Sequence, residues 1–434
     1  MKATKIFMMA ALALMTAACS NDDNDLTTPQ PQKAEGITIT AQLAPKTGGA
    51  TTRAVSEDAV NNKIVSYWAV NEHIAILYTK DATPYAADAT ITAVDGTTGA
   101  ATITFTVEDG TSDNTPCTLV YPLSAAKDDH TGVKDAATLL AAQDGTLSAN
   151  LDVRVGEGTI QTTTPGLTVT TQPAAQFSIF KFTIQNISAA AKSATEFKVS
   201  DGSGNVITTV TPGSATGTLY VGLPALATGT YWFNATIDSK PYIAKATTAA
   251  ATVAGKYYQT TVKMATIGDV ILSDGKFAAR SSTGTKVAMI AYLGSSTGVA
   301  GYTHGLALAL SDVSANQLSW DNTYANNAGK TAAEWCSDWN TTKTITGGTW
   351  MLPSKDQWNK MINACKNVLG TKNDYRDLRD GFNGISGASN LQSAYYWSST
   401  EVNSDNAWDC NFLNGNWDSD YKDYYCRVRA CLAF

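Results

Sequence analysis

The sequence predicts a mostly β protein, in which two tandem antiparallel β-sandwiches are followed by an α+β domain. Two observations carry this prediction. From residue 36 to 264, apolar and polar residues alternate in short stretches that Gly, Asp, Asn and Pro interrupt, as in half-buried strands joined by turns. After Met264 the composition changes, because eight of the ten tryptophans and five of the seven cysteines lie there. This clustering indicates a separate C-terminal domain.

Composition excludes several classes of protein. The chain has 434 residues, of which 44% are hydrophobic and 16% charged, and its net charge is −7. An acidic chain lacks the basic face that nucleic-acid binding needs, so we expect no nucleic-acid partner. The apolar content suffices for folded cores and argues against a disordered chain. Three histidines leave little room for a histidine-rich metal site or a histidine-dependent triad.

Residues 1–18 have the form of a signal peptide, with a basic start and an apolar stretch too short to span a bilayer. The stretch ends at residues 16–19 in Thr-Ala-Ala-Cys, which resembles a bacterial lipoprotein signal. The resemblance implies lipidation of Cys19 and anchoring in the cell outer membrane. The alternative is an ordinary signal peptide with an incidental cysteine.

Residues 19–35 are predicted to form an acidic and polar tether. The acidic run at residues 20–25 resembles the surface-export signal of lipoproteins in the Bacteroides group, and a plain solvated tether is the alternative. No later apolar stretch is long enough for a transmembrane helix.

The two sandwiches are predicted at residues 36–163 and 164–265, with the turn-rich segment 161–173 between them. The first strand, Ile37–Leu43, alternates strictly. It therefore places four apolar side chains on one face, namely Ile37, Ile39, Ala41 and Leu43. Neither sandwich contains a catalytic constellation.

Several segments of this part of the chain follow one another in an order typical of one family. They are Thr-Arg-Ala-Val at 52–55, Trp68, Ile-Ala-Ile-Leu-Tyr at 74–78, Val-Tyr-Pro at 120–122, the strand at 174–182, and Tyr-Tyr-Gln-Thr-Thr-Val at 257–262. With the lipoprotein signal, this order resembles the fimbrillin-like family of Bacteroidales, which contains pilins and pilus-associated lipoproteins. The resemblance covers about residues 36–264 and implies Greek-key sandwiches.

The resemblance also implies a route of assembly. A trypsin-like surface protease cuts after a basic residue in the loop that follows the first strand, and that strand leaves. Another fimbrial subunit then adds a strand to the open sheet edge. The cut is expected between Arg53 and Ala54, within small residues that proteases favour, and Lys46 is the alternative site. The alternative is that Arg53 is a loop arginine without a role in processing.

Residues 266–434 are predicted as the α+β domain. A helix is expected at residues 356–369 behind the N-cap Ser354, and a second one at 331–339. The motifs Gly-Thr-Trp-Met-Leu-Pro-Ser at 348–354 and Tyr-Tyr-Trp-Ser-Ser-Thr-Glu at 395–401 resemble the Fibrobacter-type major paralogous domain. That domain is related to C-type-lectin-like and formylglycine-generating folds.

A polar loop near the end of the chain contains the candidate ligand-binding residues. Its exposed aromatic side chains are expected to contact a ligand. They are Trp417, Tyr421, Tyr424 and Tyr425. The same loop holds carboxylates that are weak candidates for calcium, Asp418, Asp420 and Asp423, and a solvated loop is the commoner explanation. Apart from calcium, no cofactor is expected.

Export makes disulfides possible in the C-terminal domain. The candidates are Cys336, Cys365, Cys410, Cys426 and Cys431. Bridges from Cys336 or Cys365 to Cys426 or Cys431 are what the lectin-like resemblance implies, and the pairing stays open.

Enzymatic motifs are weak. Residues 294–298 match Gly-x-Ser-x-Gly but no helix is predicted after them, and the nearby His304 is too close for the usual order. Glu401 and Asp409 are possible paired carboxylates with nothing to favour that role. The closely spaced Cys426 and Cys431 leave a copper-dependent formylglycine-generating activity as a remote alternative.

We therefore predict a non-enzymatic, surface-exposed fimbrial subunit at the tip of a fibre, whose C-terminal domain binds a host or bacterial glycan or a protein. Two alternatives stay open. One is a surface lipoprotein that binds polysaccharide and never polymerises, and the other is an enzyme on the formylglycine-generating fold.

Overall fold

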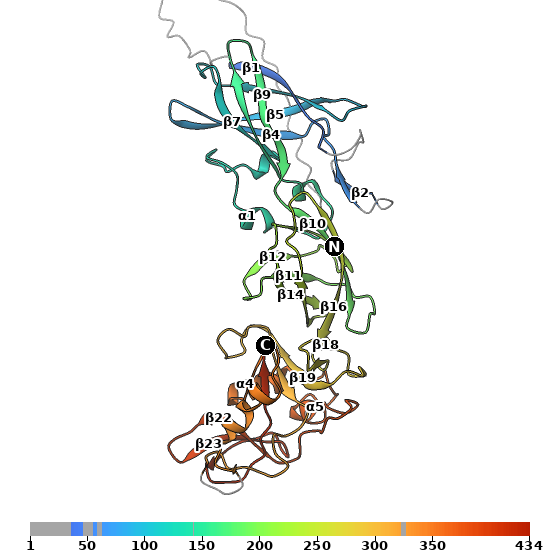
Figure 1. Cartoon of the computed structure of the whole chain (residues 1–434), viewed down its shortest axis with the longest axis vertical. Coiled ribbons are helices and arrows are strands. Elements are labelled where there is room, and N and C mark those ends of the chain that lie inside the picture. The colour runs from blue at the N-terminus through green and yellow to red at the C-terminus, as the bar shows by residue number, and fades with distance from the viewer. Residues whose placement is uncertain (1–35, 47–54, 59–62, 142, 323–326) are drawn as a thin grey trace, which may run out of the picture.

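The computed structural model describes residues 36–46, 55–58, 63–141, 143–322 and 327–434. Three sheet-based regions follow one another along the long axis of the molecule, from the blue N-terminal strands to the red C-terminal end (Figure 1). The fold is mostly β with antiparallel sheets, as predicted. Among the described residues, no helix has the length and apolar character needed to cross a membrane.

The N-terminal sheet has seven strands in the order β1-β6-β5-β4-β7-β8-β9. Its strands are β1 (Ile37–Leu43), β4 (His73–Lys80), β5 (Thr83–Val94), β6 (Ala101–Val107), β7 (Thr115–Tyr121), β8 (Arg154–Gln161) and β9 (Gly166–Ala175). The sheet curls until its two ends, β1 and β9, lie side by side, and the Ala44 amide donates to the Gln172 side chain across that seam. The curled sheet encloses one apolar core.

Strand β9 corrects a predicted boundary. The sequence prediction placed residues 164–175 in the second sandwich, whereas β9 pairs antiparallel with β8 in the N-terminal sheet. Residues 162–165 are the tight turn of this hairpin, since Gln161 pairs with Gly166. The Thr-, Pro- and Gly-rich composition that suggests a linker is equally the composition of a hairpin turn.

A long excursion between β7 and β8 covers the outer face of the N-terminal sheet. It contains the short helix α1 (Ala136–Leu140), which Asp135 caps by accepting from the Thr138 amide. Leu140 and Val153 of this excursion pack with Leu77 and other side chains in a second, smaller core.

The second sheet also has seven strands, in the order β12-β11-β14-β15-β16-β10-β13. They are β10 (Ser178–Asn186), β11 (Glu196–Ser200), β12 (Val206–Val210), β13 (Thr218–Leu223), β14 (Gly229–Ile237), β15 (Lys240–Thr248) and β16 (Tyr257–Thr266). β15 and β16 pair only through Tyr242–Thr266 and Ile243–Ala265, so the sheet folds there into two faces around one core. Within it, β10 and β16 run parallel.

The C-terminal region combines helices with two sheets. The larger sheet has the order β18-β17-β19-β20-β25-β21, and the smaller is β22-β23-β24. The strands are β17 (Val270–Leu272), β18 (Phe277–Ala278), β19 (Lys286–Leu293), β20 (Gly305–Ala309), β21 (Thr349–Met351), β22 (Tyr395–Glu401), β23 (Asn406–Asn411), β24 (Trp417–Tyr421) and β25 (Cys431–Ala433). The helices are α2 (Ala332–Ser337), α3 (Trp339–Thr342), α4 (Lys355–Cys365) and α5 (Tyr375–Arg379).

The two predicted helices of this region are present. Capping boxes start both of them, Thr331 with Glu334 before α2 and Ser354 with Gln357 before α4. α4 ends at Cys365, four residues before the predicted end. The apolar spacing continues past Cys365, but there the chain turns instead of continuing the helix.

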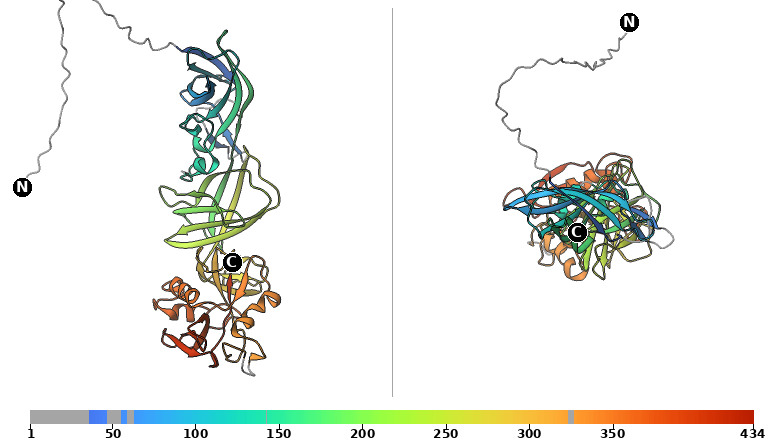
Figure 2. Two further views of the ribbon diagram at one scale, coloured as in Figure 1. Left: turned by 90° about the vertical axis from the view of Figure 1, so that its left-hand side faces the viewer. Right: turned by 90° about the horizontal axis from the view of Figure 1, so that it is seen from above.

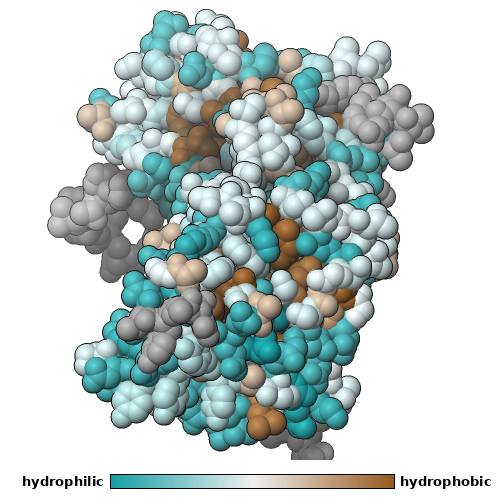
Figure 3. Space-filling view, turned by 60° about the horizontal axis from the view of Figure 1, so that its bottom comes forward, coloured by the Kyte–Doolittle hydropathy of each residue, from teal (hydrophilic) through white to brown (hydrophobic). Residues whose placement is uncertain are grey.

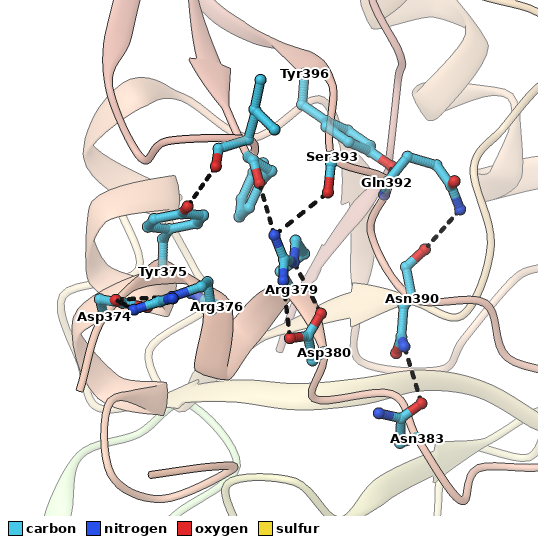
Figure 4. Close-up of polar contacts among 12 residues, drawn as sticks. Asp374, Tyr375, Arg376, Arg379, Asp380, Asn383, Asn390, Gln392, Ser393 and Tyr396 are labelled. Atoms are coloured by element: carbon cyan, nitrogen blue, oxygen red, sulfur yellow. Dashed lines mark hydrogen bonds and ion pairs between the residues drawn. The ribbon is translucent and has the colours of Figure 1, made fainter. Parts of the chain in front are cut away.

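Helix α5, which the sequence pattern did not reveal, fixes the loop that precedes β24. The Tyr375 hydroxyl donates to the Leu413 carbonyl at 2.6 Å, and the Arg379 guanidinium bonds both Asp380 and the Phe412 carbonyl. Figure 4 shows these contacts converging on α5 from several segments. The small sheet is thereby held against the helical part of the region.

The second sheet and the C-terminal region share one core. Trp232, Ile243 and Ala265 of the second sheet belong to the same buried cluster as the C-terminal strands. The chain end lies at this junction (Figure 2), where the carbonyl of Phe434 accepts from the amides of His304 and Gly305. The junction is therefore packed and hydrogen-bonded.

Candidate functional site

Strand β1 stands at one end of the N-terminal sheet and pairs only with β6 among the described strands. Its alternation turns Ile39, Ala41 and Leu43 inward, where each is less than a tenth exposed. The outward hydroxyls of Thr38 and Thr40 meet threonine hydroxyls of β6. A strand in this position is bound by one ladder of backbone hydrogen bonds and one row of apolar side chains.

Lys46 lies three residues beyond β1, and its side chain is fully buried. Its Nζ lies 3.2 Å from Asp152 Oδ2 and 3.8 Å from Glu72 Oε2. The same atom lies 4.2 Å from the ring centre of Trp68 and 3.5 Å from that of Tyr121. Burial lowers the pKa of Lys46. We call Trp68, Glu72, Tyr121 and Asp152 the cation cage.

The walls of the cation cage are fixed by bonds of their own. Asp152 accepts from the Ser66 hydroxyl and from Arg154 Nε at 2.8 Å. Glu72 accepts from the Tyr121 hydroxyl at 2.7 Å, and Trp68 Nε1 donates to the Ala44 carbonyl at 2.8 Å. Two carboxylates are thus held beside one buried ammonium.

This burial corrects one predicted processing site. A protease needs an extended, accessible segment around the bond it cuts. The Lys46 side chain is enclosed by the cation cage, so Lys46 is not an accessible site. The other predicted processing residues, Arg53 and Ala54, and the predicted lipid site Cys19 lie outside the described residues.

The chain becomes described again in a hairpin of β2 (Val55–Asp58) and β3 (Lys63–Ser66). Glu57 connects this hairpin to the second sheet. Its carboxylate accepts from Lys181 Nζ at 2.7 Å, from the Tyr220 hydroxyl at 2.5 Å and from the Tyr257 hydroxyl at 2.9 Å. The bond from Lys181 is the largest cause of the lowered pKa of Glu57. The segment just after Ala54 is therefore docked on a neighbouring sheet.

The predicted aromatic surface is exposed in part. Tyr421, Tyr424 and Tyr425 are each more than 40% exposed, and the rings of Tyr421 and Tyr424 are 5.8 Å apart. Trp417 differs, because it is half-buried and its Nε1 donates to Asn359 at 3.0 Å. Figure 3, which brings the C-terminal end forward, shows a mostly hydrophilic face with hydrophobic residues in recesses.

A pocket of about 680 Å³ lies beside these tyrosines. Tyr395, Asp420, Tyr424 and Cys426 line it together with Asp423 and Tyr425. The sequence prediction missed Tyr395, which comes from β22. Tyr395 is an exposed aromatic residue at the start of a strand, and such a residue does not stand out in the sequence pattern.

The predicted calcium candidates do not gather as a set. The structure instead brings ligand atoms of Asp409, Asp420 and Cys426 within 4.8 Å of one another. Asp409 lies opposite Asp418 in the pairing of β23 with β24. Calcium prefers several oxygen ligands, and a thiol in this set departs from that preference.

Asp409 is the unusual member of this cluster. It is fully buried, and within the described part of the chain neither of its carboxyl oxygens has a hydrogen-bond partner. Desolvation, followed by the charges of Asp420 and Asp418, raises its pKa to about 8. Glu401, the other carboxylate of the considered pair, is exposed and bonded to Lys422 at 3.0 Å. The two carboxylates thus lie in unlike environments, and Asp409 can hold a proton at neutral pH.

A second pocket, of about 1030 Å³, lies between the second sheet and the C-terminal region. Its walls include Trp232, Lys245, Phe277 and His304. His304 stacks on Trp232 with ring centres 3.8 Å apart, and burial lowers its pKa to about 4. No sequence motif marks this pocket, because its residues come from two regions.

The Gly-x-Ser-x-Gly segment lacks the surroundings of a nucleophile. Ser296 is exposed, and no helix follows the segment. His304, on the other hand, faces the pocket between the two regions. Within the described residues, no hydrogen bond joins Ser296 to a histidine.

The predicted disulfides are not formed. Cys336, Cys365, Cys410, Cys426 and Cys431 are free, buried thiols, as is Cys117 of the N-terminal sheet. Each lies in an apolar core, where burial raises the pKa of the thiol. Here the cysteines serve as small apolar residues.

No protein-family profile matches the chain, and no curated protein is significantly similar to it. Among solved structures, the chain is similar to a fimbrial protein of Bacteroides ovatus, with 12% identity over 92% of this chain and 100% of the other and a TM-score of 0.31. It is similar to a fimbrial assembly protein of Parabacteroides distasonis, with 12% identity over 52% of this chain and 90% of the other and a TM-score of 0.29. It is also similar to the pilus 2b backbone protein of group B streptococcus, with 12% identity over 56% of this chain and 90% of the other and a TM-score of 0.18. Values of this size assign no family and no function, and the lectin-like resemblance of residues 266–434 stays a prediction.

Proposed function

We propose that this protein is a surface-exposed fimbrial subunit that loses β1 by proteolysis and accepts a strand from another subunit in its place. The edge position of β1 is the observation that carries the proposal. β1 is bonded to one neighbour and covers the core with three inward side chains. Its loss leaves the β6 edge and an apolar groove, and another extended strand satisfies both.

The free energy of burial favours refilling the groove that β1 leaves. Burying an Ile or Leu side chain contributes about 1.5–3 kcal/mol, and β1 buries one of each, Ile39 and Leu43. The open state therefore exposes apolar surface and an unpaired strand edge at once. An incoming strand with the same alternation restores these contributions, so exchange leads toward a filled sheet.

The C-terminal region supports a place at the tip of the fibre. A subunit that donates a strand must release one, but β25 is paired on both sides, with β20 and with β21. Cys431, Leu432 and Ala433 are fully buried, and Phe434 nearly so. Segment 431–434 therefore cannot serve as a donor strand without opening the core of its own region.

In this proposal the C-terminal region binds the ligand, a host or bacterial glycan or a protein. The exposed tyrosines beside the pocket in the small sheet provide a contact surface, since tyrosine offers a large rigid area and a polar end. The uncut chain is held in the outer membrane by lipid on Cys19, and cleavage releases it from the anchor.

Mass spectrometry of the protein from sheared fibres tests the assembly half of this proposal. We expect chains that begin at Ala54, and chains that begin only at lipidated Cys19 would overturn the proposal. An Arg53→Ala variant is the matched control and should accumulate uncut in the membrane fraction. A glycan array probed with the processed protein, and with a Tyr421→Ala/Tyr424→Ala variant, tests the ligand half.

A further inference from the structure

We propose that the cation cage at the end of β1 is a recognition site for a lysine or arginine side chain on the incoming donor strand. The inference rests on the proposed function, because it concerns the site that Lys46 leaves when β1 departs. The ligand class is an extended peptide with alternating apolar residues, followed by a cationic residue.

The position of Lys46 in the chain starts the argument. Lys46 precedes the expected cut at Arg53, so it is removed together with β1. It is held at the same time by two carboxylates and two aromatic rings. Loss of the strand therefore empties the groove above the core and the cation cage in one event.

The charges left behind decide what refills the cage. Asp152 keeps Arg154 as a partner, and Glu72 keeps the Tyr121 hydroxyl. Asp152 also keeps the Ser66 hydroxyl and Glu72 the Ala69 amide, but without Lys46 the Arg154 guanidinium is the one cation beside the two carboxylates among the described residues. Removing one partner of a buried ion pair is costly, because the remaining charge stays desolvated. A cation restores the balance and regains the aromatic faces of Trp68 and Tyr121.

The register of the donor strand follows from the backbone contacts. Leu43 is the last inward residue of β1, and Lys46 comes three positions later. Between them, Ala44 uses only backbone atoms, donating to Gln172 and accepting from Trp68. The site therefore selects apolar residues at alternating positions and a cation three residues after the last, and it is indifferent to the residue at position 44.

An exchange experiment on the cleaved full chain tests the inference. Seven residues are arginine, and the six in described segments are buried or partly buried. Arg376, whose side chain is 42% exposed, is paired with Asp374 at 2.6 Å, so an arginine-specific protease should cut first at Arg53. Labelled, end-capped peptides with the sequence of residues 37–48 are then added. One keeps lysine at position 46, one carries Lys46→Arg, and one carries Lys46→Met.

We expect the lysine and arginine peptides to enter the cleaved protein, and the methionine peptide to bind about 10- to 100-fold more weakly. Equal binding of all three would overturn the cage inference while leaving strand exchange intact. Failure of every peptide to enter would contradict the proposed function itself. The two failures are therefore distinguishable.

A variant of the cage provides a second readout. Asp152→Asn in the full chain should reduce the preference for lysine over methionine, with Glu72→Gln as the substitute if that variant does not fold. Asp88→Asn, an exposed carboxylate on β5 paired with His73, is the matched control and should leave the preference unchanged. An unaltered preference in both cage variants would overturn the assignment.

Discussion

At the scale of single residues, the structure separates groups that look alike in the sequence. Asp409, Asp418 and Asp420 are three acidic residues of one hairpin, but only Asp409 is fully buried. The difference arises because Asp409 lies on the central strand of the small sheet, whereas the other two lie on its edge strand.

Replacing Asp409 with Asn tests the protonation of this residue. A carboxyl whose folded pKa is raised to about 8 keeps a proton over the pH range in which the unfolded chain has lost it. The free energy of unfolding of the native protein therefore falls between about pH 4 and pH 8, by at most about 1.4 kcal/mol per pH unit. Asp409→Asn should remove this slope and be more stable than the native protein at pH 8.

Urea unfolding at pH 5, 6.5 and 8 measures the effect, and Glu401→Gln is the control that should change little. A loss of stability in Asp409→Asn at pH 8 would contradict the prediction. It would mean that the ionised carboxylate is held there by a cation.

At the scale of elements, the predictable parts are those with a local signal. The strict alternation of residues 37–43 predicts β1 and its buried face, and the capping boxes predict where α2 and α4 begin. The cation cage carries no such signal. Its members come from the segment before β4, from β7 and from the excursion before β8, and only the folded sheet brings them together around Lys46.

The boundary at 163/164 fails for a related reason. A turn between two strands of one sheet and a linker between two sheets have the same composition, and pairing with β8 decides between them. The predicted disulfides are absent for a similar reason. Five cysteines clustered in one domain have the composition of a disulfide-bonded domain, but here all five are unpaired thiols in one apolar core.

The hairpin of β2 and β3 provides the next prediction. Glu57→Gln should lower the free energy of unfolding by about 1–3 kcal/mol at neutral pH, since one carboxylate accepts from Lys181 and two tyrosines. The pKa of Glu57 is lowered in the folded state, so its contribution is present above its unfolded pKa and is lost as the pH falls through the folded value. The native protein and the variant should therefore converge in acid.

Glu196→Gln is the matched control for this change. Glu196 is a partly exposed acid of the second sheet that pairs with Lys198 at 2.8 Å, and its removal should cost about 0–1 kcal/mol. Equal effects of the two substitutions would show that the hairpin is not docked through Glu57.

At the scale of the whole molecule, the junction between the second sheet and the C-terminal region couples these two regions to each other. Trp232 packs into the C-terminal core and stacks on His304, so the two regions share apolar surface and should unfold together at neutral pH. Between the N-terminal part of the chain and the second sheet, the contacts include polar bonds, from Lys181 to Glu57 and between Gln143 and Gly222, and the packing of Phe177 with Leu77 and Leu140.

The environment of His304 predicts that the stability of this junction depends on pH. His304 is buried against Trp232 and faces Lys245, and its pKa is lowered to about 4. Between about pH 6.5 and pH 4 the unfolded chain takes up a proton that the folded chain does not bind, so the stability of the junction falls as the pH falls.

Calorimetry should show one transition for the two regions at pH 7 and two at pH 4.5. His304→Phe should keep the single transition at both pH values, because the ring is retained and the proton uptake is lost. His73→Gln, which changes an exposed histidine of β4, should behave like the native protein. Two transitions at pH 4.5 in His304→Phe would place the acid-sensitive group elsewhere, whereas two transitions of the native protein at pH 7 would contradict the shared core itself.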